Sequence, residues 1–172
     1  MKTTIAKPFL IFLLILFSGQ LTKAQDEKFE ALFIYNFTKY IEWPGENQSS
    51  EFVITVLGND DIIHELESIS SRMRANNKPI VIKKATSALA IPPTQILFVP
   101  KEKSSEIPQV LESIKNRNIL LITQKTNACN LGAALNFISK GGNLSFELNR
   151  ENIEKYGLKV NSQLFPLGTV VQ

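Results

Sequence analysis

Few residues in this sequence have the types and spacing that catalysis requires. The chain contains one histidine, His64, and one cysteine, Cys129. A Ser-His-Asp hydrolase would have to use His64, yet the sequence has no Gly-x-Ser-x-Gly motif, and His64 lies among charged residues at helical spacing. A structural zinc site would need several Cys or His ligands. We therefore interpret His64 as an exposed helix position and predict a protein that is not an enzyme and that uses no metal or cofactor.

Three acidic residues, Asp60, Asp61 and Glu65, could offer oxygen ligands to a hard cation such as calcium. Their spacing does not match a calcium-binding loop. Acidic side chains are, in contrast, common in the first turn of a helix, because they interact favourably with the helix dipole. We expect these residues to stabilise the start of a helix.

The turn Gly58, Asn59 and Asp60 is the candidate ligand-binding site. It follows the apolar, β-branched segment 52–57, which predicts a buried strand, and precedes apolar residues at helical spacing. Open α/β sheets bind ligands at this position, between the carboxyl end of a strand and the start of a helix. The turn lacks the second and third glycines of a dinucleotide-binding loop, so a turn without a ligand is the alternative.

The segment around Trp43 is the candidate partner-binding site. Trp43 is the only tryptophan, and Pro44 restricts the backbone just after it. A tryptophan in a constrained loop is a good anchor for a partner, and we include Tyr40 in this candidate site. The alternative is that Trp43 covers the edge of the hydrophobic core.

The N-terminus predicts export. Two basic residues, Lys2 and Lys7, come before an apolar stretch over residues 9–17. A candidate cleavage point follows Ala24. Nine apolar residues form about 14 Å of helix, too short for a hydrocarbon core of about 30 Å. We therefore predict a signal peptide over residues 1–24, one mature domain over residues 25–172, and no membrane insertion after cleavage.

Cleavage would change the charge of the protein. It removes three of the 19 basic residues and none of the 16 acidic residues, which leaves equal numbers of each. A neutral chain has no general attraction for phosphate backbones, so we do not expect nucleic-acid binding. A single cysteine forms no disulfide within the chain, and we interpret Cys129 as a small buried residue.

The order of the predicted elements indicates an α/β domain. Apolar residues at helical spacing run from Phe29 to Ile41, and two further helical stretches follow the strands. The predicted strands are the short apolar segments 52–57, 79–82, 96–99 and 119–122. Buried strands that alternate with amphipathic helices predict a single layered domain with a largely parallel mixed sheet flanked by helices.

The C-terminal third predicts a different arrangement. Segments 135–139 and 144–148 are separated by Lys-Gly-Gly-Asn, which indicates an antiparallel hairpin. Asn149 is suited to cap a short helix that ends at Gly157. We expect residues 158–172 to be extended, with Val160, Leu164, Leu167 and Val170-Val171 available for the core.

These features together resemble the YfiR family of periplasmic proteins. The residues that carry the resemblance are Ala31 to Pro44, Val56 to Asp60, Ile96 to Val99, Leu135 to Phe137, Gly142, Phe146 to Asn149, Gly157-Leu158, Ser162, Leu164 and Leu167. The resemblance covers nearly the whole mature chain in order. It implies a periplasmic α/β domain, often dimeric, with no known enzymatic activity.

Founding members of the family repress signalling: they bind the periplasmic sensor domain of an inner-membrane diguanylate cyclase, lower cyclic-di-GMP synthesis and limit biofilm formation. Two features depart from the pattern. The founding members have cysteine pairs, which a single Cys129 does not reproduce, and Gly132-Ala133-Ala134 replaces a typical Gly-Gly. The resemblance therefore implies docking on a membrane sensor, either a cyclase or a sensor kinase, with a homodimer as a further possibility. The alternative hypothesis is a periplasmic small-ligand-binding protein.

Overall fold

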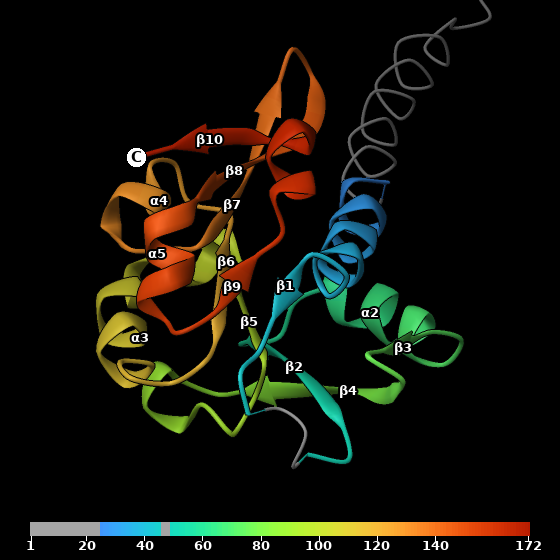
Figure 1. Cartoon of the computed structure of the whole chain (residues 1–172). Coiled ribbons are helices and arrows are strands. Elements are labelled where there is room, and N and C mark those ends of the chain that lie inside the picture. The colour runs from blue at the N-terminus through green and yellow to red at the C-terminus, as the bar shows by residue number, and fades with distance from the viewer. Residues whose placement is uncertain (1–24, 46–48) are drawn as a thin grey trace, which may run out of the picture.

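The computed structural model describes residues 25–45 and 49–172 and is α/β, as predicted (Figure 1). The predicted signal peptide, residues 1–24, lies outside the described residues. An eight-stranded sheet has the order β10-β8-β7-β6-β5-β2-β4-β3, and a two-stranded sheet pairs β1 with β9. The strands are β1 (Ile41–Glu42), β2 (Phe52–Leu57), β3 (Arg74–Ala75), β4 (Lys78–Ala85), β5 (Ile96–Val99), β6 (Leu120–Thr123), β7 (Leu135–Lys140), β8 (Asn143–Asn149), β9 (Lys159–Val160) and β10 (Thr169–Val171).

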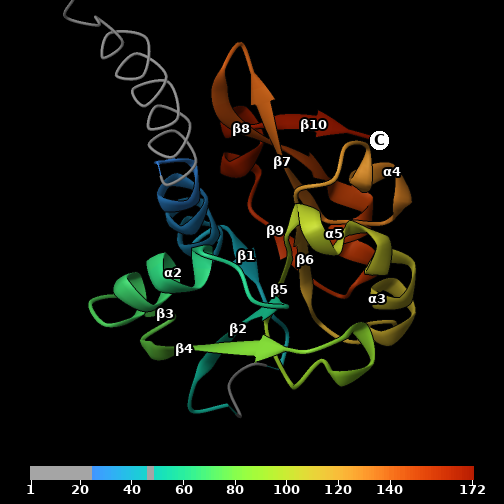
Figure 2. The ribbon, with the colours of Figure 1, turned by 180° about the vertical axis from the view of Figure 1, so that it is seen from behind.

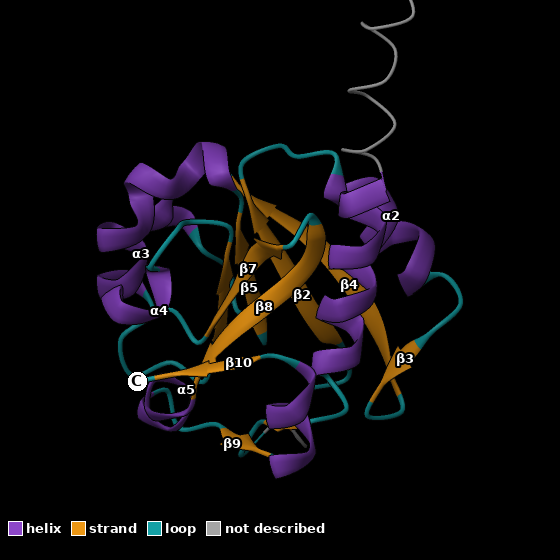
Figure 3. Cartoon of the chain, turned by 90° about the horizontal axis from the view of Figure 1, so that it is seen from above, coloured by secondary structure: helices purple, strands orange, loops and turns teal. Residues whose placement is uncertain are grey.

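Helices cover both faces of the large sheet. The N-terminal helix spans residues 25–37 and lies beside α2, and α3, α4 and α5 lie on the other side of the molecule (Figures 2 and 3). The other described helices are α2 (Ile62–Ser70), η2 (Ala88–Ala90), η3 (Lys101–Glu106), α3 (Ile107–Ser113), α4 (Ala128–Leu131), α5 (Arg150–Lys155) and η4 (Ser162–Leu167).

The five central strands β4, β2, β5, β6 and β7 are parallel, so their carboxyl ends meet at one edge of the sheet. All residues of β2, β5 and β6 are buried, which explains why these segments are almost entirely apolar. The chain goes from β2 to β4 on one side and then returns to β5 on the other side of β2. The sheet therefore has its topological switch point between β2 and β5.

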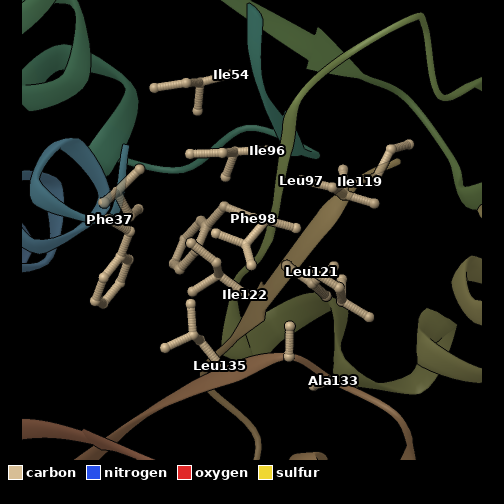
Figure 4. Packing of buried hydrophobic residues seen from close by; sticks show 14 of the residues in the cluster. Phe37, Ile54, Ile96, Leu97, Phe98, Ile119, Leu121, Ile122, Ala133 and Leu135 are labelled. Atoms are coloured by element: carbon tan, nitrogen blue, oxygen red, sulfur yellow. The ribbon is translucent and has the colours of Figure 1, made fainter. Parts of the chain in front are cut away.

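The N-terminal helix is held to the sheet by aromatic packing. Phe37 is 1% exposed, and its ring centroid lies 5.0 Å from that of Phe146 in β8 and 6.2 Å from that of Phe137 in β7. Figure 4 shows Phe98 pointing from the sheet toward Phe37, with Ile54 and Ile96 extending to the same side of the sheet. Burial of each such side chain contributes on the order of 2 kcal/mol, so this cluster fixes the helix against the sheet.

The C-terminal hairpin is confirmed. Strands β7 and β8 pair antiparallel around the predicted Gly-Gly turn. The Asn149 side chain accepts a hydrogen bond of 2.9 Å from the backbone N–H of Asn152 and so caps α5. Gly157, with φ of 71°, follows the end of this helix as expected.

Two expectations about segment ends are wrong. The N-terminal helix stops at residue 37, because Tyr40 and Ile41 leave it to bond the C-terminal segment: Ile41 pairs with Val160, and the Tyr40 carbonyl accepts a 2.7 Å hydrogen bond from the backbone of Asn161. The C-terminal segment is not continuously extended, because η4 forms a turn of helix within it. This turn buries Leu164 but leaves other apolar side chains of the segment exposed to solvent. Leu167 and Val170 are 54% and 51% exposed and are not in the core.

Candidate functional site

A cavity of about 370 Å³ lies at the carboxyl edge of the sheet, beside the switch point. Its floor comes from residues that follow three parallel strands: Asp60 after β2, Lys101 after β5 and Gln124 after β6. The N-terminal helix and the β7–β8 hairpin form its walls. We call this the edge cavity; its lining residues are Asp26, Glu27, Glu30, Asp60, Lys101, Glu102, Gln124, Phe137, Ile138, Ser139 and Leu144.

Glu30 is the most buried charged residue of the edge cavity, with 4% of its surface exposed. The N-terminal helix carries it on the same side as the buried residues Ile34 and Phe37, at spacings of four and seven. Nε2 of Gln124 donates to both carboxylate oxygens of Glu30, at 2.8 and 2.7 Å. Oε1 of Gln124 accepts a 2.9 Å hydrogen bond from the backbone N–H of Lys101, which fixes the orientation of the amide.

Burial raises the pKa of Glu30 from 4.5 to about 7. The hydrogen bond from Gln124 opposes this shift, whereas the negative charges of Asp60, Asp26 and Glu27 add to it. None of the described basic side chains forms an ion pair with Glu30. Near neutral pH, Glu30 is therefore divided between a neutral acid and a carboxylate, and a positive charge in the cavity would favour the carboxylate.

Of the predicted ligand residues, only Asp60 lines the edge cavity. Its Oδ1 accepts a 3.0 Å hydrogen bond from the backbone N–H of Ile62 at the start of α2. Asn59 and Asp60 together line a neighbouring hollow of about 430 Å³, in which Oδ1 of Asn59 accepts a 2.9 Å hydrogen bond from Nζ of Lys84. Gly58, with φ of 85°, forms the turn itself. Of these three residues, Asp60 is thus the one whose side chain is available to a ligand in the edge cavity.

The predicted partner residues lie at two different places. Trp43 is 6% exposed, donates a 3.0 Å hydrogen bond from Nε1 to the carbonyl of Gln95, and packs edge-on against Phe52 with ring centroids 5.0 Å apart. Pro44 is exposed beside it, at the amino ends of the strands. Tyr40 lines a separate small groove next to the N-terminal helix. The indole of Trp43 therefore covers the core edge, and Tyr40 and Pro44 have more of their surface free.

This groove, of about 150 Å³, lies between the N-terminal helix and η4. We call it the helix groove; its lining residues are Phe33, Asn36, Phe37, Lys39, Tyr40, Phe146, Leu164 and Leu167. Leu167, which lines it, is 54% exposed, and Phe29 and Leu32, which are 44% and 37% exposed, lie one helical turn before the lining residues Phe33 and Asn36. Lys39 lies 4.7 Å from the centre of the Tyr35 ring and places a positive charge near the groove.

The remaining candidate residues have structural surroundings. His64 is exposed on α2. Cys129 is 2% exposed, and burial raises the pKa of its thiol to about 12, with the charge of Glu147 as a smaller cause. In the part of the chain that the structure describes, no group of three or more His, Cys, Asp or Glu side chains is arranged to hold a metal ion.

Glu30 and Gln124 were not predicted as site residues. One signal for Glu30 was present, because this charged residue falls on the buried side of the helix by its spacing to Ile34 and Phe37. No comparable signal marks Gln124, whose contact with Glu30 joins positions 94 residues apart.

A protein-family model described as YfiR/HmsC-like matches residues 27–169 of the chain. The match includes both the edge cavity, apart from Asp26, and the helix groove. A search of curated proteins gives no match. Over residues 25–45 and 49–172, no helix has the length and apolar character needed to cross a membrane.

Proposed function

Because the chain belongs to the YfiR/HmsC-like family, we propose that it is a periplasmic regulator that docks on the outer domain of an inner-membrane sensor and represses its signalling. The family consists of regulatory proteins and not of enzymes, and it suggests a diguanylate cyclase as the regulated protein. A sensor kinase is the alternative partner. We also propose that residues 1–24 are removed during export, which the intact mass of the exported protein would test.

The exposed apolar side chains around the helix groove support a docking role. Phe29 and Leu32 are exposed and lie one helical turn before Phe33 and Asn36, which line the groove together with Tyr40 and Leu167. Aromatic and aliphatic side chains around a small hollow are typical of the centre of a protein interface, where an anchor side chain of the partner is buried. These exposed apolar side chains next to the groove are the observation that supports docking at this surface.

Docking on this surface would regulate a receptor by unequal binding. A protein outside the membrane biases a receptor only if it binds one of the receptor's conformations more tightly than the other. Loss of a central anchor residue in an interface typically costs about 2 kcal/mol or more, which lowers affinity about 30-fold. Changes at the helix groove should therefore release the sensor without unfolding the regulator.

The first test uses the double variant Phe29→Ser, Leu32→Ser in cells that lack the chromosomal gene. Deletion should raise cyclic-di-GMP, the unaltered chain should lower it again, and the double variant should fail to do so. Leu131→Ser is the matched control, because Leu131 is 51% exposed on α4, away from the helix groove. The control should repress fully, and both variants should be exported in equal amounts.

Two outcomes would contradict the proposal. Full repression by the double variant would exclude this docking surface. If deletion leaves cyclic-di-GMP unchanged, repression of a cyclase is wrong, and crosslinking from position 167 in intact cells would show whether a sensor kinase is bound instead. Crosslinks from this position to a second copy of the chain would identify the surface as the contact of a homodimer.

Tyr40 and Pro44 enter the docking proposal differently. Tyr40 lines the helix groove and would contact a partner there. Trp43 would act indirectly, by holding the segment from β1 to residue 45 against the core through its bond to Gln95. Pro44 is exposed at the far end of this segment and would contact only a partner that extends over the amino ends of the strands.

Small-ligand binding is the second function that we propose, because the edge cavity lies at the switch point and contains a buried carboxylate. The two functions are compatible, since the N-terminal helix contributes Glu30 to the cavity and Phe29 and Leu32 to the surface. A ligand that stabilised the position of this helix would change docking. A thermal shift of the purified protein tests ligand binding separately from docking, because any ligand specific for the folded state raises the melting temperature.

A further inference from the structure

We propose that the edge cavity binds a small organic amine, with the ammonium group between Glu30 and Asp60 and the apolar part against Phe137 and Leu144. This inference rests on the proposal that the cavity is a ligand site and is independent of docking. It specifies the charge and the shape of the ligand, whereas membership of the family specifies neither.

The charge of the ligand follows from the cavity lining. Five carboxylates, those of Asp26, Glu27, Glu30, Asp60 and Glu102, and one amine, that of Lys101, line it. Lys103, the next basic residue along η3, is already paired with Glu106 at 2.7 Å. The lining thus has a clear excess of negative charge, which favours a cation and disfavours a phosphate or a carboxylate.

Glu30 is the group that a cation would stabilise most. Its carboxylate is buried, no described basic side chain pairs with it, and it is repelled by Asp60 and Asp26. A buried carboxylate without a positive partner is unfavourable, and an ammonium group that reached both Glu30 and Asp60 would convert this repulsion into attraction. Gln124 already holds the Glu30 carboxylate in place, so a ligand would meet an ordered group.

The shape of the cavity favours an amine with an apolar part. On the hairpin side of the cavity the apolar side chains are those of Phe137 and Leu144, which share the face of β7 and β8 that bears Phe146. Phe137 is 5% exposed and belongs to the aromatic cluster that packs against the N-terminal helix. A volume of about 370 Å³ accommodates a molecule with one ring and a short chain.

The test compares three probes of nearly equal shape: 2-phenylethylamine, 2-phenylethanol and 3-phenylpropanoate, which are cationic, neutral and anionic. Each is titrated at millimolar concentration into the exported protein, and binding is followed by backbone NMR shifts and by the melting temperature. We expect 2-phenylethylamine to bind, with shifts at Glu30, Gln124 and Ile138, and the other two to bind at least about tenfold more weakly.

Two variants assign the binding to the cavity. Glu30→Gln should lower the affinity for 2-phenylethylamine at least about tenfold. Asp60→Asn keeps the side-chain oxygen that accepts the hydrogen bond from Ile62, so the start of α2 should be undisturbed. The variant loses the negative charge and should therefore bind 2-phenylethylamine more weakly. It replaces Glu30→Gln in the test if that variant does not fold. Glu151→Gln changes an exposed carboxylate on α5, outside the edge cavity, and should leave affinity unchanged.

The pH dependence of binding gives an independent readout. Because the pKa of Glu30 is about 7, raising the pH from 6 to 8 increases its ionised fraction about tenfold. The affinity for 2-phenylethylamine, which stays protonated over this range, should rise by a similar factor. Glu30→Gln should abolish this dependence.

Each contrary result has a distinct meaning. If the neutral or anionic probe binds in the cavity and the amine does not, the cavity is a ligand site but the inference of an amine is wrong. If none of the three binds, the amine inference fails, and so does the ligand function unless a wider set of small molecules raises the melting temperature. If calcium or magnesium alone binds, with NMR shifts at Glu30 and Asp60, the cavity is a metal-ion site and the inference of an organic amine is wrong.

Discussion

Replacement of Glu30 by glutamine should remove a specific pH dependence of stability. In the folded protein the pKa of Glu30 is about 7, compared with 4.5 ordinarily, so the folded state holds this proton at pH values where the unfolded chain has released it. Between pH 4.5 and 7 the folded state therefore binds more protons than the unfolded state. Its free energy of unfolding falls as pH rises through this window.

The magnitude follows from the two pKa values. At about 1.4 kcal/mol for each pKa unit, the difference between 4.5 and about 7 amounts to about 3 kcal/mol. The protein should thus lose about 3 kcal/mol of stability between pH 4.5 and pH 8. Glu30→Gln stays neutral and still accepts a hydrogen bond from Gln124, so it should lose much less and should be the more stable protein at pH 8.

Urea denaturation at half-unit pH intervals measures this effect. Glu151→Gln, an exposed carboxylate, is the control and should follow the unaltered protein. The pKa of Glu106 is lowered below 4.5 by its hydrogen bond from Lys103. Its titration therefore changes the stability mainly below the range of pH 4.5 to 7 in which Glu30 acts. The same slope in Glu30→Gln and in the unaltered protein would refute the assignment of this proton to Glu30.

Three further predictions concern packing. Trp43→Ala should lower the free energy of unfolding by about 3 kcal/mol or more in urea, because it leaves a cavity and an unbonded Gln95 carbonyl; a loss of docking with unchanged stability would contradict its role as a core cover. Gly168→Ala should cost about 1 to 3 kcal/mol by the same assay, since the new methyl group would lie 2.7 and 2.8 Å from ring carbons of Phe146. Cys129 should react slowly with a thiol reagent until the protein is unfolded, because it is buried and its pKa is raised to about 12; rapid reaction in the folded state would show that the site opens.

Much of the architecture was predictable from local patterns. The apolar segments that became β2, β5 and β6 are buried on both faces, and continuous apolar runs of this length are typical of central parallel strands. The Gly-Gly hairpin and the Asn149 cap were predictable because each depends on backbone geometry within a few residues. These features have short-range causes that a sequence records directly.

The sites depended on contacts between distant residues. Trp43 is a core residue because it meets Gln95 and Phe52, and no pattern near Trp43 distinguishes such burial from an exposed anchor. Leu167 has the apolar character of a core residue but is exposed, because η4 directs Leu164 inward in its place.

The edge cavity shows the same limit most clearly. The spacing of Glu30 to Ile34 and Phe37 indicates that it faces the core, but the spacing does not identify the groups that surround it. Asp60 and Gln124 reach Glu30 only because β2 and β6 end at the same edge of the sheet and the aromatic cluster fixes the helix above them. Periodicity in a sequence reports which side of a helix is buried, whereas the pKa of a buried carboxylate depends on charges that only the folded chain brings together.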